Sequence, residues 1–141
     1  MGNSGTKVHP SYLPGLVKTL TEAYLPDDRN IVYDTLDQID ALLLNKKAFQ
    51  DSVKLCKELG LFYILIKSVR KLADDIEIVS LLVQILESVR FDTPLVMDFI
   101  QFGGFDLVEK IQKLHASDQF LAVSLPKILK SLYCKYVCMV T

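Results

Sequence analysis

The N-terminal residues match the pattern of a defined covalent modification. Gly2 follows Met1 and Thr6 stands four residues later, as N-myristoylation requires. In that chemistry the glycine amine, exposed once the methionine is removed, forms an amide with the fatty acid. The alternative is a polar start segment that matches by coincidence, because the pattern fixes few positions. A single myristoyl chain binds a membrane only marginally, and the sequence shows no strong basic cluster beside it.

The last four residues match a second lipidation pattern less closely. Cys138 is fourth from the end of the sequence, which is the spacing of a prenylation site. Thr141 is not a typical final residue for that site. Cys138 also continues an apolar helix face with Tyr133, Cys134 and Val137. A packing role on that face is therefore the favoured interpretation.

No other group of reactive residues predicts catalysis. His9 and His115 stand apart from any serine, cysteine or carboxylate at a catalytic spacing, and the three cysteines share no metal-ligand spacing with them. Gly103 and Gly104 would suit an anion at a helix start, but a break between two helices explains them better. The odd number of cysteines fits a reducing compartment. We therefore expect a cytoplasmic protein that is not an enzyme and needs neither cofactor nor metal.

The composition indicates one folded domain. The chain has 141 residues, is 50% hydrophobic and carries a formal net charge of −1. These values allow a sizeable core and exclude a disordered chain. The near-neutral charge argues against nucleic acid as a partner. The apolar runs are much shorter than a membrane-spanning helix requires.

Apolar residues at three- and four-residue spacing predict helices through most of the chain. Glycines end two of them, at Gly60 and Gly103, and the pair Asp74 and Asp75 is expected to cap the helix that follows. Ser11 and Thr93 are further expected N-caps. The predicted helices span residues 11–24, 29–44, 45–59, 61–72, 76–89, 95–102, 105–114 and 119–136.

Two predicted helices make more specific expectations possible. In the second helix we expect Ile31 to face the core and Asp40 to face water. In the last helix Pro126 should produce a kink or mark an irregular start, because proline lacks the amide hydrogen that a helix interior uses.

Three segments of the sequence repeat one another. Segments starting at Tyr12, Leu61 and Gly104 align on a lysine, recur at intervals of roughly 45 residues, and are each followed by an acidic cap and another apolar helix. Shorter helices ending in glycine separate them. Such periods are typical of α-solenoids, in which no unit can bury its apolar face alone.

These repeats resemble the armadillo family. Its third helix has the form G-x-I-P-x-L-V-x-L-L, and the string LPGLVK at 13–18 and the string GGFDLV at 103–108 are similar to it. The resemblance implies an all-α, right-handed α-solenoid of about three repeats over residues 11–136, with a flexible arm at 1–10 and a tail at 137–141. It also implies a non-enzymatic scaffold or adaptor that binds another protein. The chain has no Trp, and these helices have no Asn, so a nuclear-import type of peptide groove is not expected.

The repeat alignment places basic residues at equivalent positions. Lys18, Lys67 and Lys110 align, and Arg70 aligns with Lys113 one turn later. In the armadillo family the third helices line the concave face, so these residues would form a basic ladder for an acidic or phosphorylated peptide, or for an acidic membrane surface beside a lipid anchor. The alternative is a set of ordinary solvated lysines.

A second hypothesis assigns the chain a structural role. The apolar stretch FYILI at 62–66 and the apolar last helix suggest end surfaces that seek a partner or another copy of the chain. In that case the protein is a repeat module or subunit that forms homo-oligomers, without a lipid and without a groove ligand.

Overall fold

The computed structural model describes residues 9–23 and 28–140, the last two by their backbone only. Within these ranges the chain is all-helical and contains no strand, which confirms the predicted class. Single 3-10 turns, η2 (Pro10–Tyr12) and η4 (Lys46–Ala48), precede α1 and α3. The α-helices are α1 (Leu13–Glu22), α2 (Arg29–Leu44), α3 (Phe49–Leu59), α4 (Leu61–Lys71), α5 (Ile76–Val89), α6 (Thr93–Gln101), α7 (Gly104–Leu114) and α8 (Gln119–Val140).

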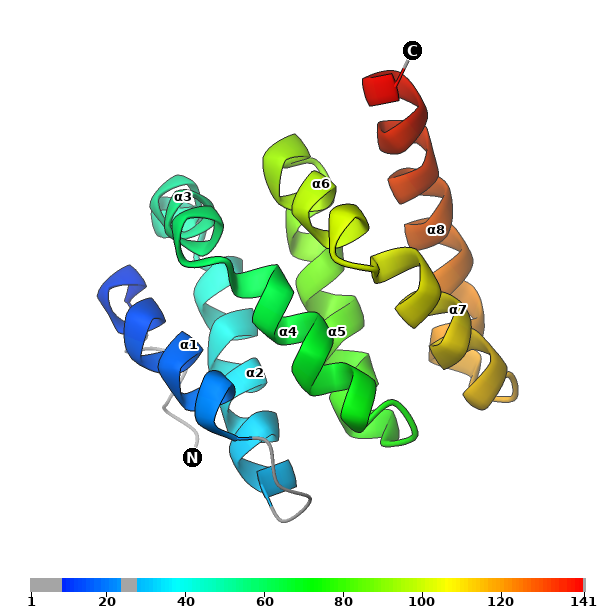
Figure 1. Cartoon of the computed structure of the whole chain (residues 1–141), viewed down its shortest axis with the longest axis horizontal. Helices are drawn as coiled ribbons and strands as arrows, with labels where there is room; N and C mark the ends of the chain where they lie inside the picture. The colour runs from blue at the N-terminus through cyan, green and yellow to red at the C-terminus, as the bar shows by residue number, and fades with distance from the viewer. Residues whose placement is uncertain (1–8, 24–27, 141) are drawn as a thin grey trace.

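The helices are arranged in two layers with two helices at one end. Helices α1, α4 and α7 lie side by side, and α2, α5 and α8 lie side by side behind them, with all three helices of a layer running in the same direction (Figure 1). Helices α3 and α6 contact each other near the C-terminal ends of α2 and α5. Helices α2 and α5, which are three helices apart along the chain, therefore pack against each other most extensively, whereas α1 and α7 pack mainly against the next helix.

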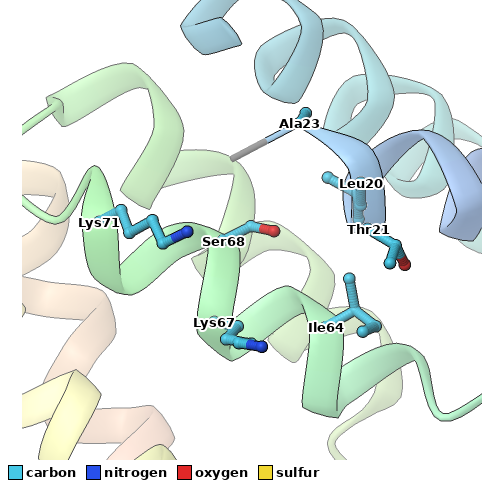
Figure 2. Close-up of a pocket in the computed structure, with 7 residues that line it drawn as sticks. All are labelled: Leu20, Thr21, Ala23, Ile64, Lys67, Ser68 and Lys71. Carbon is cyan, nitrogen blue, oxygen red and sulfur yellow. The ribbon is translucent and has the colours of Figure 1, made fainter. Parts of the chain in front are cut away.

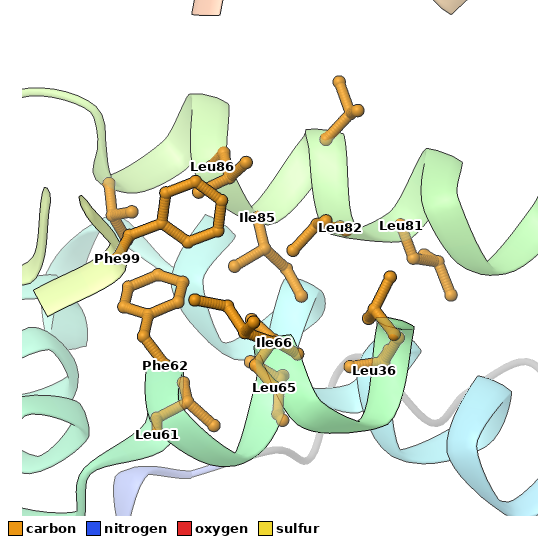
Figure 3. Close-up of a cluster of buried hydrophobic side chains, with 14 of the residues drawn as sticks. Leu36, Leu61, Phe62, Leu65, Ile66, Leu81, Leu82, Ile85, Leu86 and Phe99 are labelled. Carbon is orange, nitrogen blue, oxygen red and sulfur yellow. The ribbon is translucent and has the colours of Figure 1, made fainter. Parts of the chain in front are cut away.

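The core lies between the two layers. Figure 3 shows buried side chains from α2, α4, α5 and α6 meeting there. The rings of Phe62 and Phe99 make an edge-to-face contact with centroids 5.6 Å apart, which is a favourable geometry for buried aromatics. The largest side chains with almost no exposure are Phe62, Phe99, Leu13, Leu20, Leu36, Ile39, Leu42, Leu61, Leu65, Ile66, Ile78 and Leu82.

An ion pair joins the first residue of α2 to the N-cap of α5. Arg29 donates from Nε to Asp75 Oδ2 at 2.6 Å and from Nη2 to Asp75 Oδ1 at 3.0 Å, and it also bonds Glu77. Asp75 Oδ1 accepts the backbone amides of Glu77 and Ile78, so Asp75 is the N-cap of α5 within the predicted Asp74–Asp75 pair. One carboxylate thus caps its own helix and binds the neighbouring one.

The N-caps predicted at Thr93 and Ser11 are wrong, because the capping residue lies one or two positions earlier in the chain. Helix α6 is capped by Asp92, which accepts the amide of Leu95 at 3.1 Å, so Thr93 is the first helical residue rather than the cap. Ser11 lies inside the 3-10 turn before α1, and His9 Nδ1 accepts its amide at 3.1 Å. In both cases a better acceptor stands one or two residues earlier.

The predicted glycine breaks are confirmed. Gly60 has φ 67° and Gly103 has φ 97°, and both angles lie in the left-handed region that other residues rarely adopt. Each glycine ends one helix and is followed directly by another, α4 or α7. A glycine in the left-handed conformation therefore precedes two helices of the same layer.

The structure corrects three expectations for α2 and α8. Asp40 is buried with 6% exposure, because it lies one turn after Leu36 on the same side of the helix. Ile31 is 46% exposed, since a five-residue offset turns it about 140° away from Leu36. Helix α8 runs through Pro126 to Val140, so residues 137–140, expected as a tail, are its last turn.

Candidate functional site

Helix α4 presents one buried side and one basic side. Phe62, Leu65 and Val69 lie in the core, whereas Lys67 and Arg70 are exposed. The helix period produces this division, because residues three and four apart share a face. The basic side faces outward from the layer formed by α1, α4 and α7.

A hollow of about 300 Å³ lies between α1 and α4 (Figure 2). Its aliphatic wall includes Leu20 and Ile64, and Lys67 and Lys71 of α4 border it. Thr21 and Ser68 add hydroxyl groups to the lining. Ammonium and hydroxyl groups beside an aliphatic wall suit an anionic group that is attached to an apolar one.

Lys67 lies over an aromatic ring of its own helix. Its Nζ lies 5.6 Å from the centroid of the Tyr63 ring, within the range of a cation–π contact. The Tyr63 ring in turn meets Phe102 edge to face at 5.4 Å. Arg70 extends toward the α6–α7 turn, where its Nη2 lies 3.0 Å from the position a Cβ would take at Gly103. The basic side of α4 thus continues to the start of α7.

The structure brings the predicted basic residues onto three adjacent helices. Lys18 on α1, Lys67 and Arg70 on α4, and Lys110 and Lys113 on α7 are all exposed. Among these five, Lys67 alone borders the hollow between α1 and α4. The predicted lipidation residue Gly2 lies outside the described residues.

Two residues of this surface, Tyr63 and Lys71, are not among those predicted from the sequence. Lys71 stands one turn after Lys67, and Tyr63 stands one turn before it, so all three share a face of α4. The four-residue spacing was therefore a usable signal. Neither residue belongs to the basic positions that the repeats share, Lys18, Lys67 and Lys110 or Arg70 and Lys113, so the repeat alignment did not indicate them.

Cys138 lies on a different surface. It is exposed near the end of α8 and borders a hollow of about 500 Å³ together with Phe91, Lys130 and Cys134. The packing role expected for Cys138 on an apolar helix face is therefore wrong, because its side chain is exposed. Cys56, in contrast, is completely buried in α3.

A third hollow, of about 390 Å³, lies between α2 and α5. It is bordered by Asp40, Glu87 and Arg90, among others. Burial, with a smaller contribution from the charge of Asp37, raises the pKa of Asp40 to about 6. Asp40 Oδ1 is buried without a hydrogen-bond partner among the described residues. This carboxylate therefore costs stability when it is ionised.

The described residues contain neither a metal-binding cluster nor a helix that could cross a membrane. In residues 9–23 and 28–140, no three His, Cys, Asp or Glu side chains are grouped so that they could hold a metal ion. Over the same ranges, no helix combines the length and the apolar character needed to cross a membrane.

No protein-family model, no curated protein and no solved structure gives a significant match to this chain. The described residues define an all-helical protein in which α1, α4 and α7 expose Lys18, Lys67, Arg70, Lys110 and Lys113, while Glu22, Asp106 and Glu109 are also exposed on α1 and α7.

Proposed function

We propose that this chain is a small armadillo-like, right-handed α-solenoid that acts as a non-enzymatic scaffold. Its basic surface on α1, α4 and α7 binds an acidic or phosphorylated segment of another protein. The observation that carries the proposal is the hollow between α1 and α4, where Lys67 and Lys71 stand beside an aliphatic wall.

The helix order supports the repeat interpretation. The first helix of each unit (α1, α4 and α7) lies in one layer, and the second helix (α2, α5 and α8) lies in the other layer. The third helix of the first two units (α3 and α6) lies at one end of the layers. Helices α4 and α7 each have 11 residues and each follow a left-handed glycine. A stack of about three repeats would place equivalent helices at equivalent positions in this way.

The chemistry of the hollow limits the ligand class. Two lysines attract carboxylates and phosphates, and charge-assisted hydrogen bonds contribute about 1.5–3 kcal/mol each when they are shielded from water. The lysines here are exposed, so each contact is weaker than that. The aliphatic side chains of Leu20 and Ile64 would add affinity for an apolar residue beside the anion. We infer a weak, transient complex with a short acidic segment.

The test uses fluorescein-labelled peptides that carry two adjacent glutamates, phosphoserines or glutamines beside a leucine. Fluorescence anisotropy should show binding of the two anionic peptides, and Lys67→Glu should weaken it about tenfold or more. Lys46→Glu is the matched control, because Lys46 is exposed in the turn after α2. Equal binding of the glutamine peptide, or equal loss in both variants, would overturn the proposed site.

A lipid tether is a second part of the proposal, and its support is the sequence pattern at Gly2 and Thr6. The anchor would hold the protein at the cytoplasmic side of a membrane as a peripheral protein. Intact mass after expression with and without an N-myristoyltransferase inhibitor tests it directly. A mass that is the same in both samples, with Gly2→Ala unchanged in membrane fractionation, would contradict the tether and leave the binding surface unaffected.

A further inference from the structure

Two exposed thiols stand on one face of α8. Cys134 and Cys138 are four residues apart, so their side chains lie one turn apart on the same side of the helix. Both border the hollow of about 500 Å³ beside Phe91. A cysteine thiolate is a strong nucleophile towards the carbonyl carbon of a thioester. This face of α8 therefore carries reactive groups at the edge of a cavity.

The hollow lies between α8 and the turn that follows α5. Phe91 stands in this turn and is 75% exposed. Lys135, which also borders the hollow, donates from Nζ to Thr93 Oγ1 at 3.1 Å and so joins α8 to the first residue of α6. The surface of the hollow is almost entirely apolar, whereas that of the hollow between α1 and α4 is mixed. An aliphatic chain is the ligand group that such a surface stabilises most.

Lys127 and Lys130 add positive charge at the rim of this hollow. Both are exposed and both border it. Because the surface of the hollow is apolar, these lysines contribute their aliphatic stems to its wall and hold their ammonium groups in water. In residues 9–23 and 28–140, neither lysine forms an ion pair. The rim therefore suits an anionic group, such as a phosphate, that is attached to an apolar chain.

We propose that the hollow binds a long-chain acyl-coenzyme A and that Cys134 accepts its acyl group. The acyl chain lies against Phe91, and phosphates of the coenzyme bind Lys127 and Lys130. These lysines precede Cys134 by seven and four residues, so all three stand on one side of α8 within two turns, about 10 Å. Cys138 is one turn further from both lysines. Cys134 is therefore the thiol nearer to the coenzyme, where the thioester carbonyl lies.

The reaction is an exchange of one thioester for another. The Cys134 thiolate attacks the carbonyl carbon of the acyl-coenzyme A, and a bond forms between its Sγ atom and that carbon. The bond between the carbon and the coenzyme sulfur breaks, and this sulfur takes up the proton that the cysteine thiol lost. No atom is oxidised or reduced. This site is separate from the basic surface on α1, α4 and α7, so it adds a covalent modification to the proposed scaffold function.

The experiment is incubation of the purified full chain with palmitoyl-coenzyme A below the concentration at which it forms micelles, with a phosphine reductant. Intact mass should show one palmitoyl adduct that neutral hydroxylamine removes, and peptide mapping should place it on Cys134. Acetyl-coenzyme A at the same concentration should react about tenfold more slowly or less, because it lacks the chain that the hollow binds. Equal rates for the two acyl donors, or no adduct in the native chain, would overturn the proposal.

Variants of the hollow then test its part in the reaction, in a Cys138→Ser background that leaves one exposed thiol. Each acylation rate is divided by the rate with iodoacetamide, a small neutral reagent, so that changes in the reactivity of the thiol cancel. Phe91→Ser should lower this ratio about fivefold or more, since the ring is the main apolar wall. The matched control is Phe120→Ser, because Phe120 is an exposed aromatic residue at the start of α8 that does not border the hollow.

Charge removal tests the rim in the same background. Lys127→Gln with Lys130→Gln should lower the ratio about fivefold or more, because the phosphates of the coenzyme lose their cationic partners. The matched control is Lys110→Gln with Lys113→Gln, which removes the same charge from α7. It should leave the ratio unchanged.

The choice of thiol has its own test in the native background. Cys134→Ser should lose the adduct, and Cys138→Ser should keep it. Helical circular dichroism of every variant should equal that of the native chain. An adduct that forms on Cys138 of Cys134→Ser at the native rate would contradict the assignment of Cys134. Ratios that stay unchanged in folded Phe91→Ser would contradict the hollow as the acyl site, and either result would leave the peptide-binding proposal untouched.

Discussion

Gly104 packs directly against the ring of Phe99. A Cβ atom on Gly104 would lie 2.3 Å from Cδ2 and Cε2 of that ring and 2.6 Å from the carbonyl oxygen of Phe99. Such distances are far below van der Waals contact. Phe99 is fully buried against Phe62. The turn between α6 and α7 therefore requires a residue without a side chain in order to place an aromatic ring in the core.

Gly104→Ala should lower the free energy of unfolding by about 1–3 kcal/mol, which is the usual cost of forcing extra atoms into a packed core. Urea unfolding followed by circular dichroism measures it. The matched control is Gly15→Ala in α1, where an added Cβ meets nothing within 4 Å. That change should be neutral or stabilising by up to about 1 kcal/mol, because alanine favours a helix more than glycine does. Equal effects in the two variants would contradict the close packing.

Asp40→Asn should change how stability depends on pH. The folded state raises the pKa of Asp40 from 3.8 to about 6, so it binds a proton more tightly than the unfolded chain does. The contribution of Asp40 to the free energy of unfolding is therefore fully present below pH 3.8. It decreases by about 3 kcal/mol in total as the pH rises to about 6 and above. Asp40→Asn has no carboxyl group at this position, so its free energy of unfolding should not show this decrease with rising pH. It should gain about 1–2 kcal/mol over the native chain at pH 7, since a buried amide keeps part of the desolvation cost.

The measurement for Asp40 is the difference in unfolding free energy between variant and native chain at several pH values from 4 to 7. The control is Asp34→Asn, because Asp34 is exposed on the same helix. It should give a difference near zero at every pH. A difference that does not grow with pH for Asp40→Asn would mean that this carboxylate is not buried in solution.

Asp75 should show the opposite dependence on pH. Its hydrogen bond from Arg29 is the main cause that lowers its pKa, and the backbone amides of Ile78 and Glu77 add to this. Its contribution to stability is thus present above pH 3.8 and is lost as pH falls through the lowered pKa. Asp75→Asn keeps a capping oxygen but loses the ion pair, whereas Asp75→Ala loses both. Asp75→Ala should therefore be less stable than Asp75→Asn by about 1 kcal/mol in urea unfolding at pH 7. Equal stabilities would contradict the capping role.

Local signals in the sequence were sufficient for the helices and their breaks. Gly60 and Gly103 were found because a left-handed turn favours glycine, and Asp75 was found because an acid before an apolar run caps a helix. A charged residue is expected to face water, but Asp40 lies four residues after Leu36 and is therefore on the buried side of α2. Polarity is a poor guide where a helix has neighbours on several sides, as α2 has.

Contacts between segments far apart in the chain could not be predicted from local sequence patterns. His115 donates from Nε2 to the carbonyl oxygen of Ala73 at 2.8 Å, and Lys57 pairs with Asp98 at 2.6 Å. Both contacts join residues about 40 positions apart, and no local period encodes them. The hollow between α1 and α4 has the same origin, because its walls come from two helices that α2 and α3 separate along the chain. The basic residues were predictable, but their relation to a hollow was not.

The three cysteines should differ sharply in reactivity. Cys134 and Cys138 are exposed on α8, whereas Cys56 is fully buried in α3. Burial, with a smaller contribution from the charge of Asp92, raises the pKa of Cys56 to about 12, so at pH 8 only about one molecule in 10⁴ carries the reactive thiolate there. A thiol reagent followed by intact mass should add two labels rapidly, and the third only in denaturant. Cys134→Ser with Cys138→Ser should remove the rapid phase completely. Three rapid labels in the native chain would show that α3 opens in solution, because Cys56 is accessible only when the contacts of α3 with α1, α4 and α6 are broken.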